Sequence, residues 1–114
     1  DKKHSVPLPG LDMETHNEWT EVYRADALYV SGRMTGSAPP LDKVRRAKEA
    51  ATLPILMGSG TTAENIADFL QFADGAIVGS SLKVDGVAEN PVDLGRVQRY
   101  MAAVRGVRKT LRAK

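Results

Sequence analysis

The strongest constraint in this sequence is a repeated pattern of three parts. A short, unbroken apolar run comes first, then a turn rich in glycine and serine, then an amphipathic helix. The apolar runs lie at residues 27–30, 54–57 and 75–78. Unbroken runs of this kind are typical of strands buried on both faces, as in parallel sheets covered by helices. The alternation of strands and helices therefore predicts right-handed βαβ units and an α/β fold.

Helices are predicted after each of these strands. The first extends from about residue 41 to residue 51, with Asp42 in its first turn, where a carboxylate favours the positive end of the helix dipole. The second begins at Thr61, which has capping-box spacing to Glu64. Its apolar face comprises Ile66, Phe69, Leu70 and Ala73. The last helix is long, and its apolar stripe comprises Val97, Tyr100, Met101, Val104 and Leu111.

Small polar residues gather at the carboxyl ends of the last two strands. They form two groups of three: Gly58, Ser59 and Gly60, then Gly79, Ser80 and Ser81. Glycine lets the backbone approach an anion closely, serine adds hydroxyl donors, and the start of a following helix adds a favourable dipole. Because ligands of α/β folds bind at the carboxyl ends of the strands, the two turns together predict one phosphate site.

Either turn alone is equally well explained as a tight connection with no ligand. The spacing does not match a P-loop, because no Gly-Lys-Ser/Thr follows, and it lacks the later glycine of a dinucleotide fingerprint. The chain has no cysteine and only two histidines, His4 and His16, so the sequence predicts no metal site and no disulfide.

Length and charge limit the remaining possibilities. A chain of 114 residues has room for one modest core. No apolar run approaches the roughly 20 residues that span a bilayer, and we expect a reducing, cytoplasmic setting. The net charge of +2 is too small to indicate nucleic acid binding. The last helix is basic, and we interpret its cations as a solvated face: Arg96, Arg99, Arg105, Arg108, Lys109 and Arg112.

In five stretches the sequence resembles the BtpA/SgcQ family of the ribulose-phosphate-binding barrel superfamily. The matching segments are 3–8, 25–32 with Thr35 and Gly36, 54–65, 73–83 and 90–93. The resemblance implies a (β/α)8 TIM barrel, of which residues 1–114 would be a single partial domain, the C-terminal half with parallel strands five to eight and their helices. A complete barrel takes about 250 residues.

The resemblance also implies positions in the barrel for particular residues. It places residues 1–5 at the end of strand five, and Ser59 and Ser80 after strands seven and eight. Lys3 and His4 are then candidate catalytic residues, Lys3 as an anion ligand or acid/base and His4 as a proton carrier. A solvated, frayed terminus is the alternative. Further candidates lie in the loop after strand six: Ser31, Arg33 and Thr35.

Two functions remain open at this point. The first is binding or conversion of a small phosphorylated metabolite, a sugar phosphate or a nucleotide-like compound. The alternative is a non-catalytic assembly or stability factor for a membrane complex such as photosystem I, because the family takes its name from a factor of that kind. The sequence predicts no particular cofactor. Three complete strands cannot close a barrel, so we expect pairing with the other half of the barrel or self-association.

Overall fold

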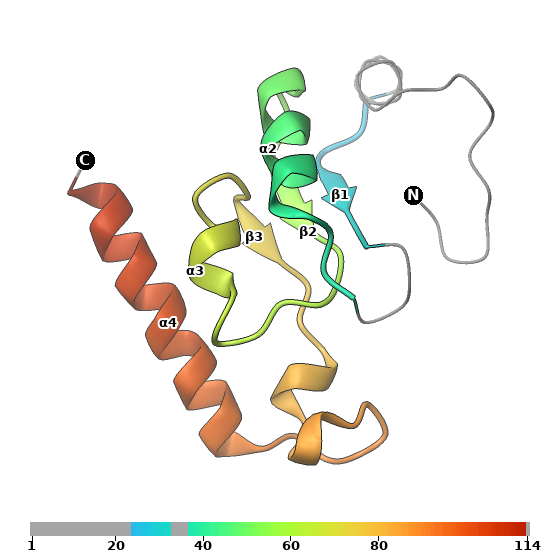
Figure 1. Ribbon diagram of the computed structural model, residues 1–114, viewed down its shortest axis with the longest axis vertical. Coiled ribbons are helices and arrows are strands. Elements are labelled where there is room, and N and C mark those ends of the chain that lie inside the picture. Colours follow the sequence, from blue (N-terminus) through green and yellow to red (C-terminus); the bar gives the residue numbers. More distant parts are fainter. Residues whose placement is uncertain (1–23, 33–36, 114) are drawn as a thin grey trace.

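A computed structural model describes residues 24–32 and 37–113 of the chain. It confirms an α/β architecture in which strands and helices alternate (Figure 1). The elements in order are β1 (Leu28–Val30), α2 (Leu41–Ala50), β2 (Ile55–Met57), α3 (Ile66–Phe69), β3 (Gly75–Ala76), the short 3-10 helices η1 (Ser80–Leu82) and η2 (Val84–Gly86), and α4 (Leu94–Arg112).

The three strands form one parallel sheet in the order β1-β2-β3. Tyr29 is paired with Leu56, and Leu56 with Gly75, so the side chains of Tyr29 and Leu56 share one face of the sheet, on which Gly75 adds no side chain. The connections between the strands contain α2 and α3, as the βαβ interpretation predicts. The carboxyl ends of all three strands therefore meet at one edge, where the glycine turns begin.

The main core lies on one face of this sheet. Leu28, Val30, Ile55 and Met57 alternate with more exposed residues and are buried. They pack with buried residues from the helices and the segment after α3: Val44, Ala47, Phe69 and Ala73. The opposite face is open, because Tyr29 is 57% exposed and Ile77 is 53% exposed.

A second apolar cluster holds α4 against α3 and η1. Its buried members are Ile66, Tyr100 and Val104, with Met101 half-buried beside them. The predicted stripe on α4 is therefore confirmed in its first half. It is wrong for Leu111, which is 39% exposed. The 19 residues of α4 extend about 28 Å at 1.5 Å per residue, whereas α3 has only four, so the last turns of α4 pass beyond the helix they pack on.

Two elements are shorter than the sequence predicts. The strand expected over residues 75–78 is regular only at Gly75–Ala76, and the backbone N–H of Ile77 donates the last ladder bond to Met57 at 2.9 Å. The helix expected from Thr61 is regular only from Ile66. Its predicted apolar face is confirmed, since Ile66, Phe69 and Ala73 are buried.

Candidate functional site

The first glycine turn continues from β2 and packs against the segment after β1. The backbone N–H of Gly58 donates to the Val30 carbonyl at 2.8 Å, which extends the sheet by one bond. The Ser59 hydroxyl lies 3.4 Å from the Ser37 carbonyl. Gly60 has a φ of +78°, and a Cβ there would lie 2.1 Å from the backbone nitrogen of Ala38. Glycine at position 60 is thus required by backbone conformation and by close packing.

The second glycine turn is more open than the first. Gly79 and Ser80 are exposed, and a Cβ added at Gly79 would meet no atom within 4 Å. The turn leads into η1, a single 3-10 turn, so the α-helix dipole that the sequence suggested at this position is not present. Packing gives no reason for glycine at position 79, and open space remains in front of it.

The structure brings the two turns into contact. The Ser81 hydroxyl donates to the carbonyl of Thr61 at 2.8 Å, and Thr61 directly follows Gly60. The backbone N–H groups of Gly60, Gly79 and Ser80 donate no hydrogen bond to any other residue in the described part of the chain. Unpaired backbone donors therefore lie in both turns. A phosphate between them stays a prediction.

The capping box predicted at Thr61 and Glu64 lies one residue later. The backbone N–H of Thr62 donates to Asn65 Oδ1 at 2.7 Å, and the Asn65 N–H donates to Thr62 Oγ1 at 3.2 Å. Asn65 also donates from Nδ2 to the Gly60 carbonyl at 3.1 Å, which ties the start of α3 to the first glycine turn. Glu64 makes no cap and is exposed.

Thr61 is displaced from the cap because its side chain joins the core. Only 2% of Thr61 is exposed, and its Oγ1 lies 3.0 Å from the hydroxyl of Tyr100 on α4. Burial raises the pKa of Tyr100, and the hydrogen bond with Thr61 opposes part of that shift. The phenol is therefore neutral and available as a donor at physiological pH.

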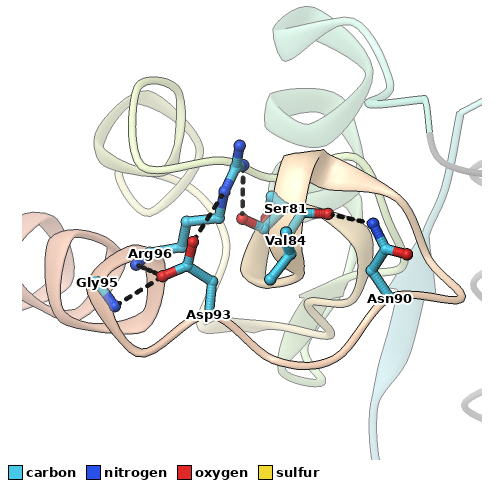
Figure 2. A network of polar contacts seen from close by, with 6 residues as sticks. All are labelled: Ser81, Val84, Asn90, Asp93, Gly95 and Arg96. Atoms are coloured by element: carbon cyan, nitrogen blue, oxygen red, sulfur yellow. Dashed lines mark hydrogen bonds and ion pairs between the residues drawn. The ribbon is translucent and has the colours of Figure 1, made fainter.

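A network of polar contacts ties the start of α4 to the second turn (Figure 2). Asp93 caps α4, because its Oδ1 accepts from the backbone N–H groups of Gly95 at 2.9 Å and Arg96 at 3.3 Å. Arg96 donates to the Ser81 carbonyl at 3.3 Å and lies 3.8 Å from Asp93 Oδ2. The interpretation of Arg96 as purely solvated is therefore wrong, because its guanidinium bridges the cap and the turn.

Beside this network is a pocket of about 160 Å³. Seven residues line it: Thr62, Ala63, Glu64, Ser81, Arg96, Arg99 and Tyr100. This pocket was not predicted from the sequence, because both arginines were interpreted as part of a solvated helix face. The available signal was the spacing of Arg96, Arg99 and Tyr100 at i, i+3 and i+4, which places them on adjoining parts of one helix surface.

The remaining predicted site residues are placed only in part. Ser31 is half-buried, and its carbonyl accepts a hydrogen bond from Lys43 Nζ at 3.0 Å. Lys3, His4, Arg33 and Thr35 lie outside the described residues, so their roles stay predictions. Within residues 24–32 and 37–113, no group of three or more acidic or histidine side chains is arranged to hold a metal ion.

A sequence model of the BtpA family matches residues 1–106 of this chain. The chain belongs to the BtpA family. Within the described residues, no helix is long and apolar enough to cross a membrane.

Among its relatives in the BtpA family are proteins from archaea, animals and cyanobacteria. It is 40% identical to an uncharacterized protein of Thermococcus kodakarensis over 95% of this chain and 41% of the relative. It is 33% identical to an uncharacterized mitochondrial protein of Caenorhabditis elegans over 95% of this chain and 39% of the relative. It is 36% identical to the photosystem I biogenesis protein BtpA of Synechocystis over 90% of this chain and 36% of the relative. The chain thus spans about two fifths of the length of these relatives.

Proposed function

We propose that this chain contributes a phosphate site that binds a small phosphorylated metabolite, a sugar phosphate or a nucleotide-like compound. The observation that carries the proposal is the contact between the two glycine turns through Ser81 and Thr61. It holds the unpaired N–H groups of Gly60, Gly79 and Ser80 at one edge of the sheet. Backbone donors beside glycine are the groups that cradle phosphate in many proteins.

In this proposal the ligand lies in front of the second turn. Gly79 leaves open space there, and the hydroxyl of exposed Ser80 supplies a further donor. Ser59 supplies the matching hydroxyl from the first turn, because its present contact with Ser37 is long at 3.4 Å and is readily exchanged. Gly58 and Ser81 complete the predicted phosphate site, and they also shape the turns, since the Gly58 N–H donates to Val30 and the Ser81 hydroxyl to Thr61.

The open sheet face supports completion of a (β/α)8 barrel by the rest of the full-length protein. Tyr29 and Ile77 point from this face and are more than half exposed, and Leu56 lies between their strands. β1 and β3 are the two edges of the described sheet and are free to pair with further parallel strands. In such a barrel, Lys3, His4, Ser31, Arg33 and Thr35 would lie around the mouth, in the reducing, cytoplasmic setting expected from the sequence.

A second candidate function follows from the similarity to one relative. A relative 36% identical to this chain is named a photosystem I biogenesis protein. The corresponding proposal is a non-catalytic factor that supports assembly of a membrane complex, with the barrel mouth as a docking surface. It predicts that phosphorylated metabolites do not bind at the paired turns.

A thermal-shift screen of the full-length protein distinguishes the two proposals. The ligands are inorganic phosphate, sugar phosphates and nucleotides, and the variants are Ser59→Ala and Ser80→Ala. Thr110→Ala is the matched control, since Thr110 is exposed near the far end of α4. We expect ligands to raise the melting temperature of the wild type and the control, and to do so much less in the two serine variants. Equal shifts in all four proteins, or none, would reject the paired turns as a phosphate site.

A further inference from the structure

The pocket between residues 62–64, η1 and α4 lies beside the second glycine turn and shares Ser81 with it. Its lining includes neither Ser59 nor Ser80 nor any glycine. We propose that it is a second anion site, in which Arg99 and Arg96 hold the phosphate group of a small ligand. The proposal does not depend on phosphate binding at the turns.

Arg99 is the principal cation of this site. Its side chain makes no hydrogen bond or ion pair with any other residue in the part of the chain that the structure describes. A guanidinium carries five N–H donors in a planar fork that matches two oxygens of a phosphate. An arginine that lines a pocket with its donors unused is available to bind an oxyanion there.

Arg96 is the second cation of the pocket, and two contacts hold its side chain in position. Its contacts with the Ser81 carbonyl and Asp93 fix the guanidinium but leave other N–H donors free. Arg96 and Arg99 are three residues apart on α4, so their side chains leave the helix on the same side. No acidic residue occurs between Leu94 and Arg112, so the helix surface behind the pocket carries only positive charge.

The opposite wall adds a constraint on the ligand. Glu64 is the single acidic residue that lines the pocket, and it forms no ion pair with Arg96 or Arg99. It repels an anion and therefore weakens binding of a bare phosphate. A volume of about 160 Å³ has room for a phosphate group.

The test is a phosphate titration of the full-length protein by NMR, at constant pH and ionic strength. The side-chain Nε–H resonance of Arg99 reports on this pocket, and its shift against phosphate concentration gives Kd. Inorganic phosphate is compared with glycerol 3-phosphate, to separate free phosphate from a phosphate ester. The variants are Arg99→Gln and Glu64→Gln, and Arg105→Gln is the control, being exposed on α4 outside the pocket.

We expect phosphate to bind saturably to the wild-type protein, and the Arg99 side-chain resonance to report that binding. Backbone amides of Thr62 and Ala63 report on the same pocket in the arginine variant. Arg99→Gln should weaken binding by about tenfold or more, since charge-assisted hydrogen bonds are lost. Glu64→Gln should tighten inorganic phosphate binding by about threefold, because a repulsion is removed. Arg105→Gln should leave Kd unchanged.

The proposal is overturned if no saturable shift occurs in the pocket, or if Arg99→Gln binds as tightly as the Arg105→Gln control. The double variant Ser59→Ala/Ser80→Ala separates this site from the paired turns. Pocket binding that persists in the double variant supports the second site whatever happens at the turns. Pocket shifts that disappear in the double variant would assign them to a ligand at the turns and reject the second site.

Discussion

The hydroxyl of Tyr100 lies 3.0 Å from Oγ1 of Thr61 in a buried contact between residues 39 positions apart. It fixes α4 to the residue that follows the first glycine turn. Since Ser81 bonds to the carbonyl of the same threonine, Thr61 joins both turns and the last helix. The arrangement of the candidate phosphate site therefore depends on Thr61, a residue that is not itself among the proposed phosphate ligands.

Tyr100→Phe tests the contribution of this contact to stability. The change removes the hydroxyl and leaves buried Thr61 Oγ1 without its partner, so we expect the free energy of unfolding to fall by about 1–2 kcal/mol. Thr61→Val is the companion change, and the double variant should lose less than the sum of the two. Urea unfolding of all four proteins measures the coupling. Strictly additive losses would mean that the two hydroxyls do not stabilise one another.

Alanine at the two turn glycines should have unequal effects. Gly60→Ala forces a side chain into the left-handed region and against Ala38, so we expect a loss of about 2 kcal/mol or more in the free energy of unfolding. Gly79→Ala adds a methyl group in open space and should cost much less. That methyl would instead obstruct a ligand in front of the turn. Thermal melts with and without ligand check both parts; comparable losses of stability would contradict the packing difference.

Asp74 links the sheet to α2 and makes stability depend on pH. Its Oδ2 accepts from the Ile55 N–H and from Lys48 Nζ, both at 2.9 Å. Partial burial acts to raise the pKa of Asp74, but the Ile55 N–H and the charge of Lys48 prevail and hold it below its usual 3.8. A carboxylate with a lowered folded-state pKa stabilises the protein above its unfolded-state pKa, and this is lost as pH falls through the folded value.

We therefore expect stability to decline below about pH 4, as Asp74 takes up a proton. Because both side chains of the pair are more than one third exposed, the contribution of the pair is a few tenths of a kcal/mol to about 1 kcal/mol. Asp74→Asn keeps an oxygen for the Ile55 N–H but has no charge. Urea midpoints between pH 3 and pH 7 should show a smaller decline in this variant. Identical pH profiles in the wild type and Asp74→Asn would show that Asp74 does not cause the loss of stability at low pH.

Removal of the Asp93 cap should loosen the start of α4. Asp93→Ala leaves the N–H groups of Gly95 and Arg96 without their acceptor and releases the Arg96 guanidinium. We expect a loss of about 1 kcal/mol in the free energy of unfolding. Asp93→Ser retains a cap but no charge and should recover most of that loss. Amide exchange at Gly95 and Arg96 is the local measurement, and unchanged protection in the alanine variant would argue against the cap.

The isolated segment of residues 1–114 should not remain a simple monomer. Tyr29 and Ile77 give it exposed apolar surface, and β1 and β3 are the edges of the sheet within the described residues. We expect self-association in light scattering at micromolar concentrations, and capture of the remaining part of the full-length protein when the two are mixed. A well-folded monomer that does not bind the remaining part of the full-length protein would count against the barrel proposal.

Much of the fold was predictable from local patterns. The three apolar runs predicted the strands, and the spacing of Ile66, Phe69 and Ala73 predicted the buried face of α3 and of the turn that follows it. Contacts distant in sequence explain what was missed. Thr61 has the residue type and spacing of a cap, but its bond to Tyr100 draws it into the core, and Thr62 with Asn65 forms the reciprocal pair instead.

The candidate site was predictable to a similar degree. Both glycine turns were identified from their composition, and the structure brings them into contact. The pocket at Arg99 was not predicted, because the wall opposite α4 comes from Glu64 and Ser81, which lie 35 and 18 positions earlier in the chain. Helical periodicity describes one surface of a helix but does not show which distant segment faces it.

The loop that precedes α4 is closed at its base and open at its tip. Lys83 and Val92 form an antiparallel bridge, the Val84 N–H donates to the Pro91 carbonyl at 2.9 Å, and Asn90 donates to the Val84 carbonyl. The intervening residues Val87, Ala88 and Glu89 are exposed. Extra sequence at this tip would leave the bridge and the Asp93 cap in place. The loop is therefore the natural position for an affinity tag or fluorophore, and the part of the chain in which length can vary between relatives without moving α4.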